Sequence, residues 1–150
     1  MGKKRILIVD NDVDTVELYS NIVLDIDLDP YGAHDLHGAI ESYERDSPHI
    51  ILTDFRYLPE TQKDHPSYNV ETGRMLAMRV RGNCGLHLPI MCLTGREREP
   101  EEVKFFNAYL IKPVIDDYMC LILTNALTGE YDNIRGVLIR KRMQIPSSVI

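Results

Sequence analysis

The stretch HIILTDF, residues 49–55, sets a single carboxylate directly after a run of apolar residues. A short, continuous apolar run predicts a β-strand that is buried on both faces, as the strands of parallel sheets are. A buried charge is costly unless other groups stabilise it. We therefore expect Asp54 to lie at the end of this strand, with polar or charged partners around it.

Similar runs occur on both sides of this strand. RILIVD, LPIMCLTG and AYLIKPV are also short and mostly apolar, while DPYGAH is a weaker candidate with a proline near its start, as an edge strand allows. The four additional predicted strands are residues 5–10, 29–34, 88–95 and 108–114.

Between the strands, apolar residues recur at helical spacing. In TVELYSNIVLDI, for example, Val16, Tyr19 and Val23 fall on one face, and either Asp12 or Asp14 can cap the helix. The predicted helices are residues 15–26, 35–46, 71–82, 97–107 and 115–127. Strands and helices alternate five times, which predicts an α/β fold with a doubly wound, five-stranded parallel sheet and flanking helices.

The composition is that of an ordinary globular domain. The chain has 150 residues, of which 44% are hydrophobic and 27% charged, so we expect one domain with a substantial core. A net charge of -6 argues against direct DNA binding, because phosphate backbones are held by clustered Lys and Arg. Three scattered cysteines indicate a reducing compartment, and no apolar run is long enough for a membrane span. Without a recognisable signal peptide, the expected location is the cytoplasm.

Polar groups are predicted at the carboxyl ends of four strands, which is where open parallel sheets bind ligands. These groups are the triplet DND at 10–12, then Asp54, Thr94 and Lys112. Clustered carboxylates need a counter-cation, and oxygen ligands suit Mg²⁺. A carboxylate beside a hard dication is in the setting of a nucleophile that attacks phosphorus, and Lys112 and Thr94 would then stabilise charge on a transferred phosphoryl group.

These motifs resemble those of the receiver domains of two-component response regulators. The matching stretches are ILIVDND, IILTDF, PIMCLTG and AYLIKP, and the resemblance extends in order and spacing over residues 4–127. It implies a flavodoxin-like fold with strand order 2-1-3-4-5. It also implies a phosphoprotein of a signal transduction pathway or phosphorelay, which needs Mg²⁺, is phosphorylated by a histidine kinase or phosphotransfer protein, and acts on a downstream protein target.

The same resemblance assigns a metal site. Asp54 is the phospho-acceptor and a metal ligand, Asp10 and Asn11 occupy the acid-pair positions, and Arg56 offers its backbone carbonyl to the ion. The family usually has an acid at the position of Asn11. An amide oxygen can still bind Mg²⁺ but brings no charge, so Asp12 is the alternative ligand.

The resemblance also assigns the residues that respond to phosphorylation. Lys112 matches the lysine that contacts the phosphoryl group, while Thr94 and Tyr109 match the switch pair. In the family, the hydroxyl moves toward the phosphoryl group and the aromatic ring turns inward, which repacks the surface around the fourth helix, the fifth strand and the fifth helix.

Two segments depart from the family pattern. After the acceptor, Pro59 is followed only much later by Gly73, where the family has a tight proline–glycine turn, so residues 60–69 look like an insertion beside the site. Long loops of this kind are functional or disordered. Beyond a receiver domain at 1–127, residues 128–150 form an extension with a basic amphipathic pattern, which we expect to be helical. It either packs on or extends the last helix, or mediates a homodimer.

The leading interpretation is a single-domain response regulator that signals through a phosphorylation-dependent surface change. It would catalyse its own phosphotransfer and dephosphorylation without being a conventional enzyme. The alternative is a diverged receiver that serves as a protein-interaction scaffold with weak or no phosphorylation, and Asn11 and the long loop favour it. A phosphatase of a related α/β fold would need a general acid two residues after the nucleophile, where this chain has Arg56.

Overall fold

The structure is a computed structural model that describes residues 2–56, 64, 71–84, 88–95, 99–112, 114 and 116–127. The strands are β1 (Lys4–Val9), β2 (Leu28–Ala33), β3 (Ile50–Asp54), β4 (Ile90–Thr94) and β5 (Ala108–Ile111). The helices are α1 (Val13–Leu24), α2 (Leu36–Asp46), α3 (Thr72–Cys84) and α4 (Asp116–Leu127), with the 3₁₀ turn η2 (Pro100–Glu102) between β4 and β5.

The five strands form one parallel sheet in the order β2-β1-β3-β4-β5. Val9, the last residue of β1, pairs with Ala33 on one side and with Thr53 on the other. The predicted fold class and strand order are therefore confirmed. Since β1 and β3 are neighbours, their carboxyl ends meet at one edge of the sheet, which places Asp10 and Asp54 close together.

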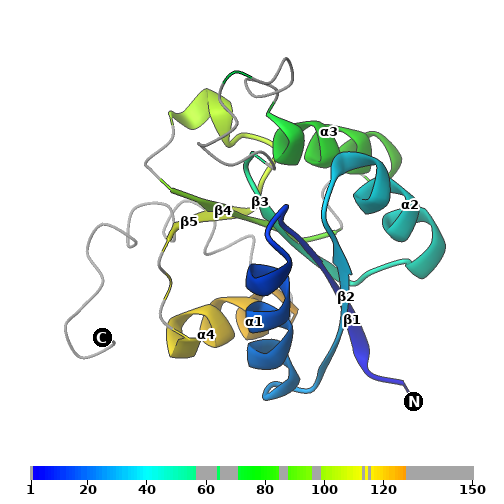
Figure 1. Ribbon diagram of the computed structural model, residues 1–150, viewed down its shortest axis with the longest axis vertical. Helices are drawn as coiled ribbons and strands as arrows, with labels where there is room; N and C mark the ends of the chain where they lie inside the picture. The colour runs from blue at the N-terminus through cyan, green and yellow to red at the C-terminus, as the bar shows by residue number, and fades with distance from the viewer. Residues whose placement is uncertain are drawn as a thin grey trace.

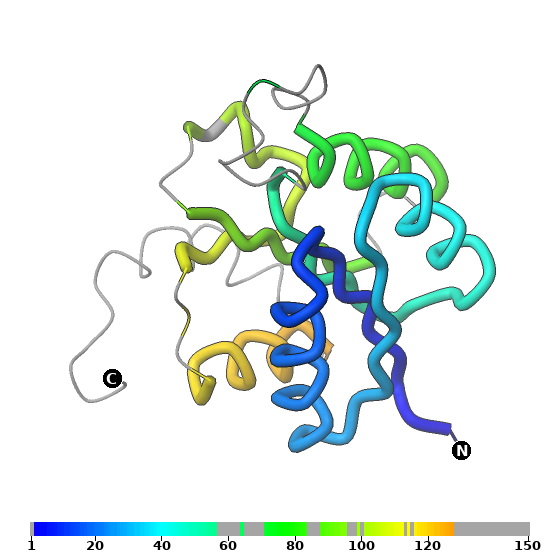
Figure 2. Tube along the Cα trace, in the orientation of Figure 1, coloured from blue at the N-terminus to red at the C-terminus, as the bar shows by residue number. Residues whose placement is uncertain are grey.

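Two helical layers cover the sheet (Figure 1). Helices α1 and α4 lie on one face, and helices α2 and α3 lie on the other. The tube in Figure 2 follows the chain through these crossovers. Side chains alternate between the two faces along each strand, so Ile6 and Ile8 join the core under α1 and α4 whereas Leu7 and Val9 join the core under α2 and α3. This double burial explains the continuous apolar runs of the strands.

The helix starts follow local capping chemistry. Asp12 is the N-cap of α1, where one side-chain oxygen accepts a hydrogen bond from the backbone N–H of Asp14. Asp35 caps α2 in the same way through the N–H of Gly38. Of the two caps expected for the first helix, the structure selects Asp12, because it directly precedes the first helical residue.

One predicted helix does not form as expected. For residues 97–107 the sequence predicted a short charged α-helix, but the described part of this segment contains only the turn η2 followed by irregular backbone. Two of its backbone hydrogen bonds are of the shorter 3₁₀ type, from Glu102 N–H to the Glu99 carbonyl and from Phe106 N–H to the Val103 carbonyl. Val103 and Phe106 are both buried, so the segment follows the packing of these side chains rather than a regular helical face.

Several expectations fall outside the described residues. The predicted insertion at 60–69 is among them except for Asp64, and so are Pro113 and the extension at 128–150. Across the part of the chain that the structure describes, none of the helices combines the length and the hydropathy that a membrane span requires.

Candidate functional site

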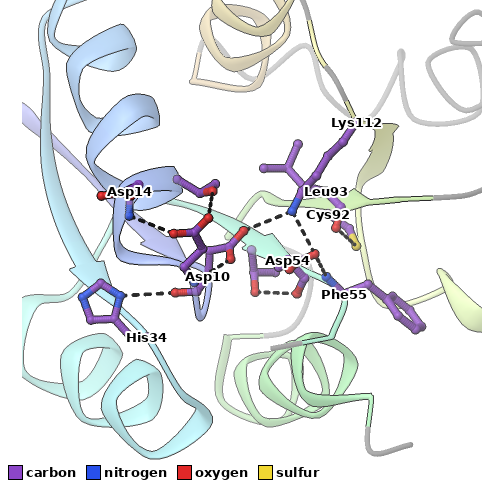
Figure 3. A network of polar contacts seen from close by, with 11 residues as sticks. Asp10, Asp14, His34, Asp54, Phe55, Cys92, Leu93 and Lys112 are labelled. Carbon is purple, nitrogen blue, oxygen red and sulfur yellow. Dashed lines mark hydrogen bonds and ion pairs between the residues drawn. The ribbon is translucent and has the colours of Figure 1, made fainter. Parts of the chain in front are cut away.

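The predicted polar groups meet at the carboxyl edge of the sheet. Asp10 follows β1, Asp54 ends the adjacent β3, and Lys112 follows β5. Figure 3 shows the side chains of these three residues directed toward one another. The Lys112 Nζ lies 3.1 Å from Asp10 Oδ2 and 3.4 Å from Asp54 Oδ1. One ammonium group therefore bridges two carboxylates that come from neighbouring strands.

Burial gives this cluster its electrostatic character. The side chain of Asp10 is 5% exposed, that of Asp54 14% and that of Lys112 30%. Loss of hydration raises the pKa of Asp54 to about 6, and the charge of Asp10 adds to the effect while Lys112 opposes it. Burial alone would lower the pKa of Lys112, but the two carboxylates together raise it. The lysine is thus held as a cation beside a carboxylate, that of Asp54, whose negative charge is poorly hydrated.

Backbone contacts fix the position of Asp10. Its N–H donates to the Ala33 carbonyl of β2 at 3.1 Å, and its Oδ1 accepts the N–H of Asp12 at 3.0 Å. Its carbonyl oxygen lies 3.2 Å from His34 Nδ1, so this ring nitrogen must carry the proton in that contact. His34 was not among the predicted site residues, although its place at the end of the predicted strand 29–34 was a usable signal.

The neighbouring residues of the DND triplet differ in their contacts. Both carboxylate oxygens of Asp12 serve the first turn of α1, since Oδ1 accepts from the N–H of Asp14 and Oδ2 accepts from the hydroxyl of Thr15, each at 3.0 Å. Asn11 lies between Asp10 and Asp12 and is partly buried. Among the described residues no third Asp, Glu, His or Cys side chain joins Asp10 and Asp54 in a group able to hold a metal ion.

Of the other predicted site residues, Thr94 lies at this edge, whereas Tyr109 lies further back along β5. Thr94 ends β4, is fully buried, and accepts the backbone N–H of Lys112 at 2.8 Å through its carbonyl oxygen. Tyr109 lies on β5 beside Cys92 and is 3% exposed, so its ring is turned inward, toward the layer of α2 and α3. Arg56 stands two residues beyond Asp54, after the end of β3, and is partly buried. The structure therefore brings Thr94 next to Lys112 and Asp54 next to Asp10.

Two further residues define the shape of the site. Gly73, in the first turn of α3, donates its N–H to the Phe55 carbonyl at 2.9 Å, and a Cβ at this position would collide with the backbone carbonyl of Asp54. Only glycine lets α3 begin this close to the end of β3. Tyr19 of α1 is buried, and burial together with the charges of Asp10 and Asp54 raises the pKa of its hydroxyl against the influence of Lys112. A tyrosine at a core-facing helical position gave no sign of this proximity in the sequence.

Comparison with known proteins supports the fold. A scan of models of known protein families finds no match, and a search of curated protein sequences finds none either. Solved structures do match. A CheY-like response regulator receiver domain protein from Methanospirillum hungatei superposes with a TM-score of 0.70 at 20% identity, and the match covers 88% of this chain and 99% of that chain. The chain has the receiver-domain fold.

Two further receiver structures give the same result. The chemotaxis protein CheY4 of Vibrio cholerae has a TM-score of 0.64 at 19% identity, with 83% of this chain and 98% of that chain covered. The signal receiver domain of an HD domain-containing protein from Pseudomonas fluorescens has a TM-score of 0.69 at 18% identity, with 86% and 98% covered. The resemblance inferred from the four sequence motifs is thus confirmed at the level of the fold.

Proposed function

We propose that this protein is a response regulator whose Asp54 accepts a phosphoryl group from a phosphohistidine of a histidine kinase or phosphotransfer protein. The observation that carries the proposal is the cluster of Asp10, Asp54 and Lys112, in which one cation bridges two buried carboxylates at the carboxyl edge of the sheet. The receiver-domain fold supports it, because receiver domains are signalling modules.

In the proposed reaction, an oxygen of the Asp54 carboxylate attacks the phosphorus atom of the donor. A P–O bond forms to Asp54 as the P–N bond of the phosphohistidine breaks, and the electron pair of that bond stays on the departing imidazole. The product is a mixed carboxylic–phosphoric anhydride. Lys112 Nζ lies within 3.4 Å of the acceptor oxygen and can follow the developing charge on the phosphoryl oxygens.

The donor set of this edge fits Mg²⁺. Asp10 and Asp54 supply carboxylate oxygens, Asn11 supplies an amide oxygen and Arg56 a backbone carbonyl, and Mg²⁺ takes few protein oxygens and keeps several waters. When bound, the ion would neutralise charge on the transferred group. The capping contacts of Asp12 favour Asn11 over Asp12 as the additional ligand, because both Asp12 oxygens already serve α1.

Thr94 and Tyr109 are the proposed switch. The Thr94 carbonyl accepts the backbone N–H of Lys112, which places Thr94, at the end of β4, beside the lysine that would contact the phosphoryl group. Tyr109 is buried on the neighbouring strand β5, so a shift of β4 would change the packing around its ring. The output is a changed protein-binding surface, and the expected setting is the cytoplasm.

Incubation with acetyl phosphate and Mg²⁺, followed by intact-mass measurement, tests the proposal. The wild type should gain one phosphoryl group, and Asp54→Asn should gain none while remaining folded. A matched control is Asp117→Asn, an exposed position on α4, which should be labelled like the wild type. If the wild type is never labelled, the alternative interpretation holds, in which the receiver fold serves as a protein-interaction scaffold. Labelling of Asp54→Asn at the wild-type rate would show that the acceptor is another residue.

A further inference from the structure

The outer face of the layer formed by α1 and α4 is both acidic and apolar. The two helices, which the structure describes in full, contain no Lys or Arg and four carboxylates, all exposed: Asp14, Glu17, Asp116 and Asp117. The opposite layer is balanced, since α2 and α3 carry Arg45, Arg74, Arg79 and Arg81 against Glu41, Glu44 and Asp46. The negative charge of the described helices is therefore concentrated on one side of the sheet.

Large apolar side chains lie among these carboxylates. Leu18 is 56% exposed and Leu121 is 53% exposed, and Val13 and Leu24 of α1 are exposed as well. On α1, the exposed Val13 and Leu18 are each adjacent in sequence to a carboxylate, Asp14 and Glu17 respectively. A face with this character fits a partner that offers cations and apolar side chains together.

The chain itself contains a segment with that chemistry. NIRGVLIRKRM, residues 133–143, carries Arg135 and the basic triplet 140–142 with no acidic residue, and its apolar residues recur at helical spacing. We propose that this segment docks on the outer face of α1 and α4 of the same molecule, pairing its basic side chains with the carboxylates and covering the exposed leucines.

The length of the connection allows this contact. Helix α4 ends at Leu127, so five residues, 128–132, precede the segment, and they can span at most about 17 Å. Gly129 among them permits the reversal that the chain needs to run back along α4. Eleven residues in a helix extend about 16 Å, close to the roughly 18 Å of the twelve residues of α1.

A second copy of the chain is a less suitable occupant. If two molecules joined through this same face, an isologous contact would bring equal carboxylates opposite one another. Such a juxtaposition of like charges is unfavourable. Docking of the basic segment instead places opposite charges next to one another. The proposed contact needs neither a metal ion nor a phosphoryl group, so it can be tested independently of the proposed function.

A tryptophan reporter tests the contact in the full chain, which has no tryptophan of its own. In Leu121→Trp the indole should be protected from acrylamide, with a quenching constant several-fold below that of the control Met78→Trp on α3. Met78 is a suitable control because it is 50% exposed on the opposite layer. Both measurements are made without Mg²⁺ or phosphoryl donor. If Leu121→Trp does not fold normally, Leu18→Trp replaces it.

Charge reversal then identifies the occupant. Adding Arg140→Glu, Lys141→Glu and Arg142→Glu should abolish the protection, and combining them with Glu17→Lys and Asp117→Lys should restore it. Equal quenching of the reporter and the Met78→Trp control would overturn the proposal. Protection of the reporter that stays unchanged in the charge-reversed variant would overturn it as well. Protection that grows with protein concentration would also overturn it, because the contact would then be between molecules.

Discussion

At position 11, an amide stands where a third carboxylate would complete the acidic edge beside Asp10 and Asp54. One unit charge acting on another at about 4 Å is worth roughly 4 kcal/mol at an effective dielectric constant of about 20, and solvation offsets much of this. We expect Asn11→Asp to bind Mg²⁺ more tightly, by about tenfold or more, because ligand charge tunes the affinity of oxygen sites. The added repulsion should also lower the melting temperature of the metal-free protein. Titration with Mg²⁺ and thermal unfolding measure both effects.

Asp12 provides the control for this prediction. Asn is as good an N-cap as Asp, so Asp12→Asn should keep the start of α1 and change Mg²⁺ affinity little. If Asp12→Asn lost most of the affinity while Asn11→Asp gained none, then Asp12 rather than Asn11 would be the ligand.

Asp54 should make the metal-free protein sensitive to pH. The ordinary pKa of this carboxyl is 3.8, and burial raises it to about 6 in the folded protein. The folded state therefore binds more protons than the unfolded state between these values, so this contribution to stability is present below pH 4 and is lost as the pH rises through about 6. A shift of this size corresponds to at most about 3 kcal/mol at neutral pH.

Asp54→Asn should remove this penalty. In metal-free buffer at pH 7.5, the variant should be about 1–2 kcal/mol more stable than the wild type, with part of the gain offset by the lost contact to Lys112. The difference should shrink toward pH 4, as measured by urea unfolding. Glu44→Gln, which removes an exposed ion pair with Arg79, should change stability by less than about 0.5 kcal/mol at either pH. A pH-independent difference would contradict the electrostatic explanation.

At the scale of elements, the strands were the most predictable feature because burial on both faces demands continuous apolar runs. Helix positions were right wherever one apolar face meets the sheet, as for Val16 and Val23 of α1. The segment at 97–107 failed because Pro100 and the charges around it suggest a helix start, while the buried Val103 and Phe106 impose another path. The periodicity of apolar residues in the local sequence does not predict such tertiary packing.

The junction of β3 and α3 depends on a single glycine. In Gly73→Ala the new methyl group would collide with the Asp54 carbonyl and lie 3.0 Å from the Phe55 Cα, so α3 or the strand end must move. We expect a loss of several kcal/mol, comparable to other overpacking changes, together with reduced phosphorylation. Gly82→Ala in the same helix is the matched control. Nothing lies within 4 Å of its added Cβ, so it should stabilise the protein by about 0.5–1 kcal/mol. Urea unfolding of both variants separates the steric effect from helix propensity.

Arg81 joins α3 to the segment before β5. Its guanidinium donates to the Phe105 carbonyl at 2.9 Å, to the Leu88 carbonyl at 2.6 Å and to Asn107 Oδ1 at 2.6 Å. Arg81→Met would keep the packing of the stem but leave these acceptors without the cation, which should cost about 2–4 kcal/mol in urea unfolding. Arg79→Met, which removes only an exposed ion pair, should cost less than about 0.5 kcal/mol. Equal losses would show that the Arg81 contacts are not a structural tie.

At the scale of the whole molecule, the site was predictable because parallel strands bring their carboxyl ends to one edge. The positions of Asp10, Asp54 and Lys112 follow from that topology alone. The contacts between these three side chains could not be predicted in this way, since the bridging position of Lys112 depends on side-chain geometry across β1, β3 and β5. The supporting contact of His34 also required the register of β2 against β1.

The arrangement of the layers determines where a signal from this edge should travel. Tyr109 packs in the core under α2 and α3, whereas Thr94 ends β4, which lies between the strand of Asp54 and β5. Phosphorylation should therefore change NMR shifts in β5 and in the segment 103–107 that Arg81 ties to α3, and change those of α1 less. Thr94→Ala should still be labelled on Asp54 but should lose most of the shift changes in β5, because it lacks the hydroxyl that we propose moves toward the phosphoryl group. Labelling measured by mass on the same samples excludes a trivial loss of phosphorylation. Identical phosphorylation-dependent shifts in wild type and Thr94→Ala would mean that the signal reaches Tyr109 by another route, with Lys112 as the remaining connection from the acceptor to β5.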